Sequence, residues 1–178
     1  MEQKMTDLDS KFDELLAHLK DSLPKEIPGG CAEATMRYIS SVLGIEEQLI
    51  NNIMISLSGG FGGYKSEKGW AGPCGAVVGG CAAVGAILGG KEKDPLAMNE
   101  IPVAYMKSAQ FAKEFENEFG SVSCPNLSGF DFSKYDGITE AMMDYMKEGV
   151  WGKTCHKYVL WAIDNVRKLM SEELKTKW

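Results

Sequence analysis

The sequence predicts an all-α fold, a compact helical bundle of about five to seven helices with one glycine-rich loop. Apolar residues recur at three- and four-residue steps in several segments, which is the period of amphipathic helices. No segment alternates apolar and polar residues over the length of a strand, so little sheet is expected. The 178 residues, of which 44% are hydrophobic and 25% charged, suit one globular unit and exclude general disorder.

Three amphipathic helices are predicted in the first third of the chain. The first covers residues 5–21 and ends before Pro24. The second covers residues 31–43, and Gly44 is its expected end. The third covers residues 46–58.

Glycine is concentrated in the next part of the chain, because twelve of the twenty glycines lie between positions 59 and 90. Residues 59–73 hold too much glycine for a regular element and are predicted to form a loop. Residues 74–88 carry no charge and follow Pro73, which predicts a helix buried on all sides. Small residues in this helix recur at four-residue steps and would let neighbouring backbones approach closely.

The rest of the chain contains three further helical patterns. Residues 103–119 are amphipathic and are closed by Gly120. Residues 138–146 are predicted to be helical, and a last strong helix is predicted from Thr154 onward. We expect an N-terminal helix in residues 1–27 and a four-cysteine helical domain in residues 28–178, as one globular unit overall.

Composition excludes some classes of function. The net charge of −6 argues against a protein that binds duplex nucleic acid, whose phosphates require cationic side chains. The uncharged run 69–90 is long enough to span a bilayer, but glycine and alanine dominate it, so no membrane insertion is expected. No secretory signal opens the sequence, which predicts a reducing, cytoplasmic location.

Four of the five cysteines stand at predicted helix starts: Cys31, Cys74, Cys124 and Cys155. The first helical turn offers unpaired N–H groups and the positive end of the helix dipole, which stabilise a thiolate. Thr154 is a good N-cap residue, so the fastest alkylation is expected at Cys74 or Cys155. Cys81 lies two turns beyond Cys74 in one helix, too far to form a disulfide with it, and is predicted to pack.

These cysteines and glycines resemble the pattern of the C_GCAxxG_C_C family. The resemblance is carried by Cys31-Ala32, the Gly59-Gly60-Phe61-Gly62-Gly63 segment, Cys74-Gly75-Ala76-Val77-Val78-Gly79, Cys124 and Cys155, and it covers residues 28–166. Residues 80–85 also fit Gly-Cys-Ala-x-x-Gly, but Cys74 follows the glycine-rich loop and opens the helix. The resemblance implies a compact helical domain with four family cysteines and a proposed role in thiol redox or electron transfer.

Three roles remain open for Cys31, Cys74, Cys124 and Cys155. They are candidate catalytic residues of a thiol/disulfide or electron-transfer protein that serves a redox partner protein. They are also candidate ligands of an iron–sulfur cluster or of zinc, although the chain has no C-x-x-C pair. In the third alternative they only pack in a non-catalytic helical domain.

The glycine-rich loop has three expected roles. It brings backbone close to Cys74, and its Tyr64 and Trp70 are expected to cover the site. The acidic protein is also a candidate homodimer through this loop.

Overall fold

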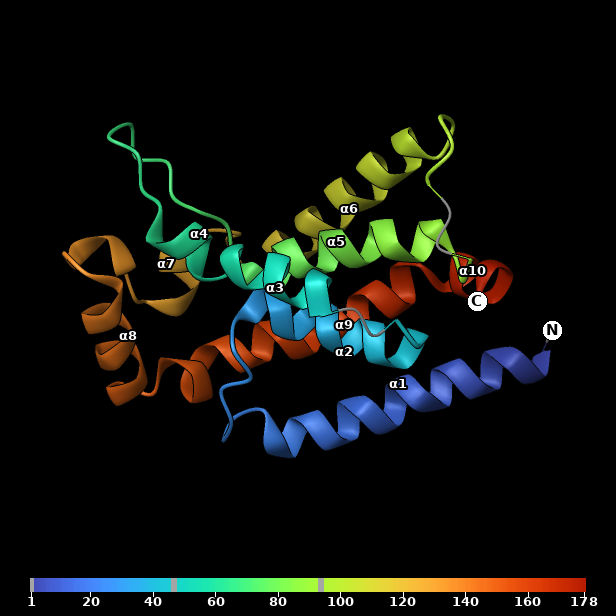
Figure 1. Ribbon diagram of the computed structural model, residues 1–178, viewed down its shortest axis with the longest axis horizontal. Coiled ribbons are helices and arrows are strands. Elements are labelled where there is room, and N and C mark those ends of the chain that lie inside the picture. Colours follow the sequence, from blue (N-terminus) through green and yellow to red (C-terminus); the bar gives the residue numbers. More distant parts are fainter. Residues whose placement is uncertain (1, 46–47, 93–94) are drawn as a thin grey trace.

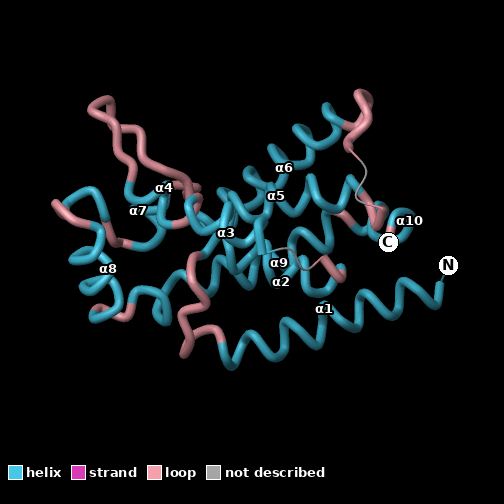
Figure 2. The backbone as a smooth tube through the Cα atoms, viewed as in Figure 1, coloured by secondary structure: helices cyan, strands magenta, loops and turns pink. Residues whose placement is uncertain are grey.

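The computed structural model describes residues 2–45, 48–92 and 95–178, and it is all-α (Figure 1). Seven α-helices in these ranges have nine residues or more: α1 (Glu2–Ser22), α2 (Cys31–Leu43), α3 (Gln48–Ser56), α5 (Gly75–Gly89), α6 (Ile101–Phe119), α8 (Ile138–Lys147) and α9 (His156–Leu169). Shorter helical segments are α4 (Gly59–Gly63), α7 (Cys124–Ser128), a 3-10 turn (Phe132–Lys134), a π-helical turn (Trp151–Cys155) and α10 (Ser171–Lys177). No strand occurs in these ranges, so the predicted fold class is confirmed (Figure 2).

The helices α2, α5 and α9 form the centre of the molecule, with α1 packed on one side of them and α6 on another (Figure 1). The segments α4, α7 and α8 gather at one end, whereas α10 lies at the other end. The largest fully buried side chains come from the central helices and from α1 and α6, and include Phe12, Ile39, Ile87, Phe111, Phe115 and Ile163. The core therefore runs along the bundle and continues into α7 and α8 through Leu127, Ala141 and Tyr145.

Several helix boundaries lie where the periodicity predicted them. The second helix covers Cys31–Leu43 as expected, and Gly44 closes it with φ of 70°. Gly120 closes α6 with φ of 79°. Both are left-handed conformations that glycine adopts without strain. The predicted start of the third helix, residues 46 and 47, lies outside the described residues.

Helix α5 approaches α2 at backbone contact through its small residues. A Cβ built on Gly79 would lie 2.6 Å from the carbonyl oxygen of Ala32 and 2.7 Å from Cβ of Thr35. The prediction that α5 is buried on all sides is wrong, because several of its residues, among them Val78 and Cys81, are only half-buried. No helix in the described ranges combines the length and the apolar character that a bilayer span requires.

The glycine-rich segment contains a regular turn that was predicted to be loop. Gly60, Phe61 and Gly62 have φ of 68°, 57° and 68° and ψ of 44°, 49° and 28°, which makes α4 a left-handed helical turn. Side chains with a Cβ pay about 1–2 kcal/mol for this conformation, and only glycine avoids that cost. The four glycines of α4 therefore permit a left-handed turn, which sequence patterns for right-handed helices do not predict.

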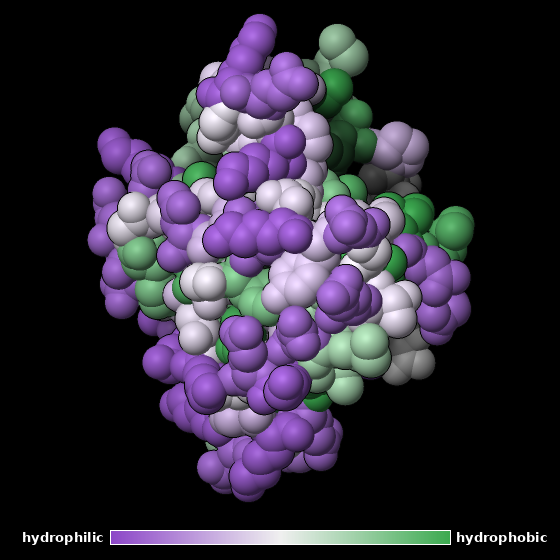
Figure 3. Space-filling model, turned by 90° about the vertical axis from the view of Figure 1, so that its left-hand side faces the viewer, coloured by the Kyte–Doolittle hydropathy of each residue, from purple (hydrophilic) through white to green (hydrophobic). Residues whose placement is uncertain are grey.

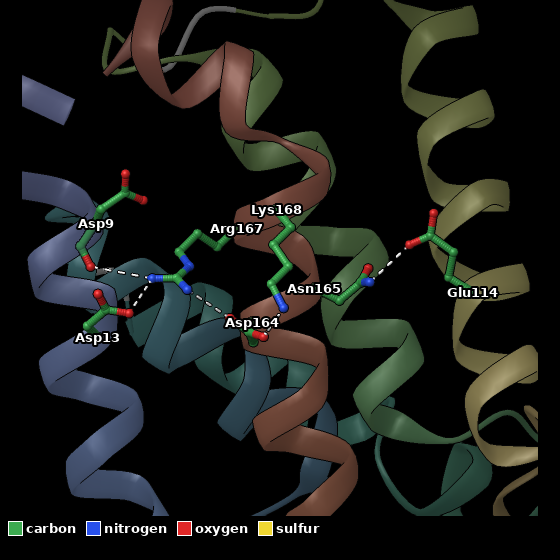
Figure 4. A network of polar contacts seen from close by, with 7 residues as sticks. All are labelled: Asp9, Asp13, Glu114, Asp164, Asn165, Arg167 and Lys168. Carbon is green, nitrogen blue, oxygen red and sulfur yellow. Dashed lines mark hydrogen bonds and ion pairs between the residues drawn. The ribbon is translucent and has the colours of Figure 1, made fainter. Parts of the chain in front are cut away.

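Polar contacts connect α9 to its two neighbours (Figure 4). Arg167 on α9 donates to Asp13 of α1 at 2.6 Å and to Asp164 at 3.0 Å. Asn165 on α9 donates to Glu114 of α6 at 2.9 Å. The Arg167–Asp13 contact and the buried face of α1 attach the N-terminal helix to the bundle, whereas Asn165 joins α9 to α6.

Candidate thiol site

The four cysteines predicted as site residues come together at the α4–α7–α8 end of the molecule (Figure 1). Cys31 is the first residue of α2, and Cys74 directly precedes α5. Cys124 is the first residue of α7, and Cys155 is the last residue of the π-helical turn. Cys31, Cys124 and Cys155 line one cavity, and the thiol of Cys74 is hydrogen-bonded to Cys31.

Backbone pairing fixes Cys74 beside Cys124. The N–H of Cys74 donates to the carbonyl of Val122 at 2.6 Å, and the N–H of Cys124 donates to the carbonyl of Gly72 at 3.0 Å. Turn α4 lies against this pair, since a Cβ on Gly60 would be 3.0 Å from Cβ of Cys124 and 3.2 Å from the carbonyl oxygen of Gly72. The glycine-rich segment was expected to bring backbone close to Cys74, but the close approach of α4 shown by Gly60 is to Cys124 and Gly72.

Cys31 lies where several donors meet. The Cys74 thiol donates to its sulfur, and so do the backbone N–H groups of Gly59 and Gly75. These hydrogen bonds outweigh burial and lower the pKa of Cys31 to about 6. A side chain at Gly75 would collide with the Cys31 sulfur and would lie 2.7 Å from the backbone nitrogen of Ala32, so this donor cluster requires glycine at position 75.

The other three site thiols are held in the neutral form. The hydrogen bond to Cys31 and then burial raise the pKa of Cys74 well above its ordinary value. Burial, followed by the charges of Cys31 and Cys155, raises the pKa of Cys124 to about 12. Burial raises the pKa of Cys155 to about 11. These pKa directions favour Cys31 over Cys74 and Cys155 as the reactive thiol, because the hydrogen bond to Cys31 at Cys74 and burial at Cys155 oppose the benefit of a helix start.

The environment of Cys155 also differs from the prediction. The helical segment begins with a π turn at Trp151, so Thr154 lies inside it and does not cap a helix at Cys155. Trp151 is buried, and its Nε1 donates to the carbonyl oxygen of Leu23 at 2.6 Å. The Tyr145 hydroxyl from α8 donates to the Cys155 sulfur. Single π turns are frequent at functional sites, and this one aims both Trp151 and Cys155 at the cavity.

The cavity beside the thiols has a volume of about 300 Å³ and a mostly apolar wall. Its apolar lining includes Ile27, Ile55, Phe132, Ile138, Met142 and Trp151. Apart from the cysteines, none of the described side chains that line it is ionisable near neutral pH. Hydrophilic residues cover most of the outer surface at this end, and hydrophobic residues show between them in smaller patches (Figure 3).

Some site residues were missed by the sequence analysis, and two were wrongly assigned. Tyr145 and Met142 lie in a helix whose pattern alone does not distinguish a cavity wall from an ordinary packed face. Tyr64 and Trp70 do not cover the thiols, since they are 55% and 72% exposed on a loop that projects from the bundle (Figure 2). Cys81 packs against the core outside the cavity and donates to the carbonyl of Ser108, as expected of a residue that does not belong to the site.

The four thiols do not fit a metal centre as they are arranged. Structural zinc requires four ligands converging at about 2.3 Å from one point when the ligands are thiolates. Within the described ranges, which include all five cysteines, no three His, Cys, Asp or Glu side chains converge in a way that could hold a metal ion. The iron–sulfur or zinc alternative stays a prediction that this arrangement does not support.

Comparison with known proteins agrees with the cysteine and glycine pattern. No curated protein and no solved structure matches the chain. The model of one family, described as "Putative redox-active protein (C_GCAxxG_C_C)", matches residues 30–169. This range includes all four site cysteines and leaves out α1 and α10. The chain therefore belongs to the C_GCAxxG_C_C family of proteins.

Proposed function

We propose that the protein is a dithiol redox protein in which Cys31 is the nucleophile and Cys74 is its resolving partner. The observation that carries this proposal is the place of the Cys31 sulfur, which lies against Gly75 directly after Cys74 and interacts with the Cys74 thiol. A low-pKa thiolate in contact with a protonated thiol is the arrangement that thiol–disulfide exchange requires. The two sulfurs are already neighbours, so a disulfide of about 2.05 Å needs only a small movement.

The exchange proceeds in two steps. The Cys31 thiolate attacks one sulfur of a partner disulfide, forms a mixed disulfide and releases the partner's other sulfur as a thiolate. Cys74 then loses its proton and attacks the Cys31 sulfur, which leaves a Cys31–Cys74 disulfide and releases the partner as a dithiol. The partner gains two electrons, and the two protein sulfurs lose them.

The effect of the Cys31 charge on the pKa of Cys74 explains why Cys31 reacts first. The hydrogen bond to Cys31 and the charge of Cys31 are both among the causes that raise the pKa of Cys74. When Cys31 forms the mixed disulfide, its sulfur becomes neutral and no longer accepts a strong hydrogen bond from the Cys74 thiol. The pKa of Cys74 then falls, so this thiol becomes a nucleophile only after the first step.

Disulfide mapping by peptide mass spectrometry tests the proposal. Mild oxidation of the reduced protein is expected to form a Cys31–Cys74 disulfide, and Cys31→Ser or Cys74→Ser should abolish it. Cys81→Ser is the matched control, because Cys81 lies outside the cavity, and its pattern should equal that of the wild type.

Two outcomes would contradict this function. One is a stable disulfide between Cys124 and Cys155 with Cys31 and Cys74 left as thiols. The other is stoichiometric iron, sulfide or zinc in protein purified without air, lost in Cys31→Ser, which would favour the metal alternative.

A further inference from the structure

The cavity beside Cys31 belongs to a ligand that carries no charge. None of the described side chains that line it is ionised, apart from the reacting thiols. Its serine hydroxyls are already used by the backbone: Ser58 accepts from the N–H of Ala32 at 3.1 Å, and Ser128 donates to the carbonyl of Cys124 at 2.8 Å. A carboxylate or ammonium group placed here would lose its water without gaining a partner, which is unfavourable.

The size and the walls of the cavity favour a flat ring. An apolar cavity of about 150 Å³ is enough to bind benzene, and this cavity has about 300 Å³. Phe132, Tyr145 and Trp151 contribute aromatic surface, and Met142 contributes a polarisable side chain. Aromatic rings and thioethers pack favourably against other rings.

Of the two reacting cysteines, only one borders the cavity. Cys31 lines the cavity, whereas Cys74 lies behind it in contact with its sulfur. A ligand in the cavity therefore meets Cys31 first, and Cys74 reaches only a sulfur that has already reacted. Tyr145, which lines the same wall, has its hydroxyl beside Cys155.

We propose that this cavity binds a small uncharged para-quinone, which the Cys31–Cys74 dithiol reduces to the hydroquinone. This inference rests on the dithiol function proposed above and gives the same site a second, small-molecule electron acceptor besides a partner disulfide. The Cys31 thiolate forms a carbon–sulfur bond with the quinone ring, and the electron pair moves to a carbonyl oxygen. Cys74 loses its proton and attacks the Cys31 sulfur, so the carbon–sulfur bond breaks and the hydroquinone leaves.

The reaction balances in electrons and protons. The two sulfurs lose two electrons and become a disulfide, while the quinone gains two electrons. One of the two protons comes from the Cys74 thiol and the other from water, because Cys31 starts as a thiolate. An external dithiol returns the disulfide to the reduced state.

Reduced, air-free protein mixed with duroquinone tests the acceptor. Duroquinone is uncharged, and methyl groups block all its ring positions against permanent substitution. The comparison compound is a trimethylated benzoquinone with a carboxylate side chain, and its methyl ester is the uncharged control of equal size. We expect duroquinone and the ester to oxidise the pair about 10-fold or more faster than the carboxylate, with one Cys31–Cys74 disulfide formed per hydroquinone.

Two neighbouring methionines supply a matched pair of variants. Met142 lines the cavity, whereas Met143 is 60% exposed and does not line it. Met142→Trp fills the cavity and should lower the rate of disulfide formation by duroquinone. The ratio of this rate to the rate with hydrogen peroxide, which is small enough to reach Cys31 in either protein, should fall about 10-fold. Met143→Trp should leave that ratio unchanged. Ile138→Trp, at a lining position that is 57% exposed and tolerant of a larger side chain, should lower the ratio as well.

The outcomes separate this inference from the dithiol function. If hydrogen peroxide fails to form the Cys31–Cys74 disulfide, the dithiol function itself is wrong. If peroxide forms the disulfide but the carboxylate reacts as fast as its ester, or the Met142 and Ile138 variants behave like Met143→Trp, the quinone site is wrong and the dithiol function stands.

Discussion

The close approach of α5 to α2 is tested by adding one methyl group at three glycines of the same helix. A Cβ on Gly75 would lie 2.7 Å from the backbone nitrogen of Ala32 and would collide with the Cys31 sulfur. A Cβ on Gly79 would lie 2.6 Å from the Ala32 carbonyl oxygen, in contact with backbone and not with a thiol. A Cβ on Gly85 would have no other heavy atom within 4 Å.

The differences between the three alanine variants isolate the contact. Replacing glycine with alanine inside a helix stabilises it by about 0.5–1 kcal/mol, and Gly85→Ala should show this gain in the free energy of unfolding. Overpacking costs about 1–3 kcal/mol, so Gly79→Ala and Gly75→Ala should each be that much less stable than Gly85→Ala. For a chain of this size, a loss of 1 kcal/mol lowers the melting temperature by about 2–4 °C.

Gly75→Ala should also change the chemistry of Cys31, which Gly79→Ala should not. Displacing the Cys31 sulfur weakens its hydrogen bonds to backbone N–H groups, so its pKa should rise from about 6 toward the ordinary thiol value. Urea unfolding measures the stability, and the ultraviolet absorbance of the thiolate against pH measures the pKa. The reasoning fails if all three variants have the stability of Gly85→Ala, or if Gly75→Ala leaves the thiolate titration unchanged.

Three further predictions follow from the same site. The rate of Cys31 alkylation should increase as pH rises through about 6, because only the thiolate reacts. Cys74→Ala removes the S–H donor and should move the midpoint of this profile upward by roughly one pH unit. A profile unchanged by Cys74→Ala would contradict the hydrogen-bonded pair. Gly60→Ala should lower the free energy of unfolding, measured in urea, by about 1–3 kcal/mol more than Gly62→Ala. Both glycines have φ of 68°, but only Gly60 is crowded by neighbours. Equal decreases in the two variants would show that crowding at α4 is unimportant. Trp151→Phe should lower stability by about 1 kcal/mol, because its Nε1 hydrogen bond to a backbone carbonyl beyond α1 is lost, and a melting temperature equal to that of the wild type would refute this role.

Helix positions were predictable because they depend on local sequence. The apolar period locates α2 and α6, and Gly44 and Gly120 end them in the left-handed conformation that the pattern implies. The left-handed turn α4 was not predictable in the same way. Its glycines permit many conformations, and contacts with neighbouring segments select one of them, as at Gly60 against Gly72.

The composition of the thiol site was also predictable, but its chemistry was not. Helix starts and the family pattern pointed to four cysteines from distant parts of the chain, and these four meet at one end of the bundle. The pKa directions of the thiols were not predictable, because a helix-start argument considers only the residue's own helix. The pKa of Cys31 depends on donors from Gly59, Gly75 and Cys74, which belong to two other segments.

The sequence by itself therefore determined the helical class, most helix boundaries and which cysteines belong together, because period, caps and residue identity are local properties. Only the tertiary structure decided which cysteine has the lowered pKa, that Cys74 lies beside it and that an apolar cavity opens next to them. Burial and hydrogen bonding act between segments far apart in the chain, and these interactions set the protonation of each thiol.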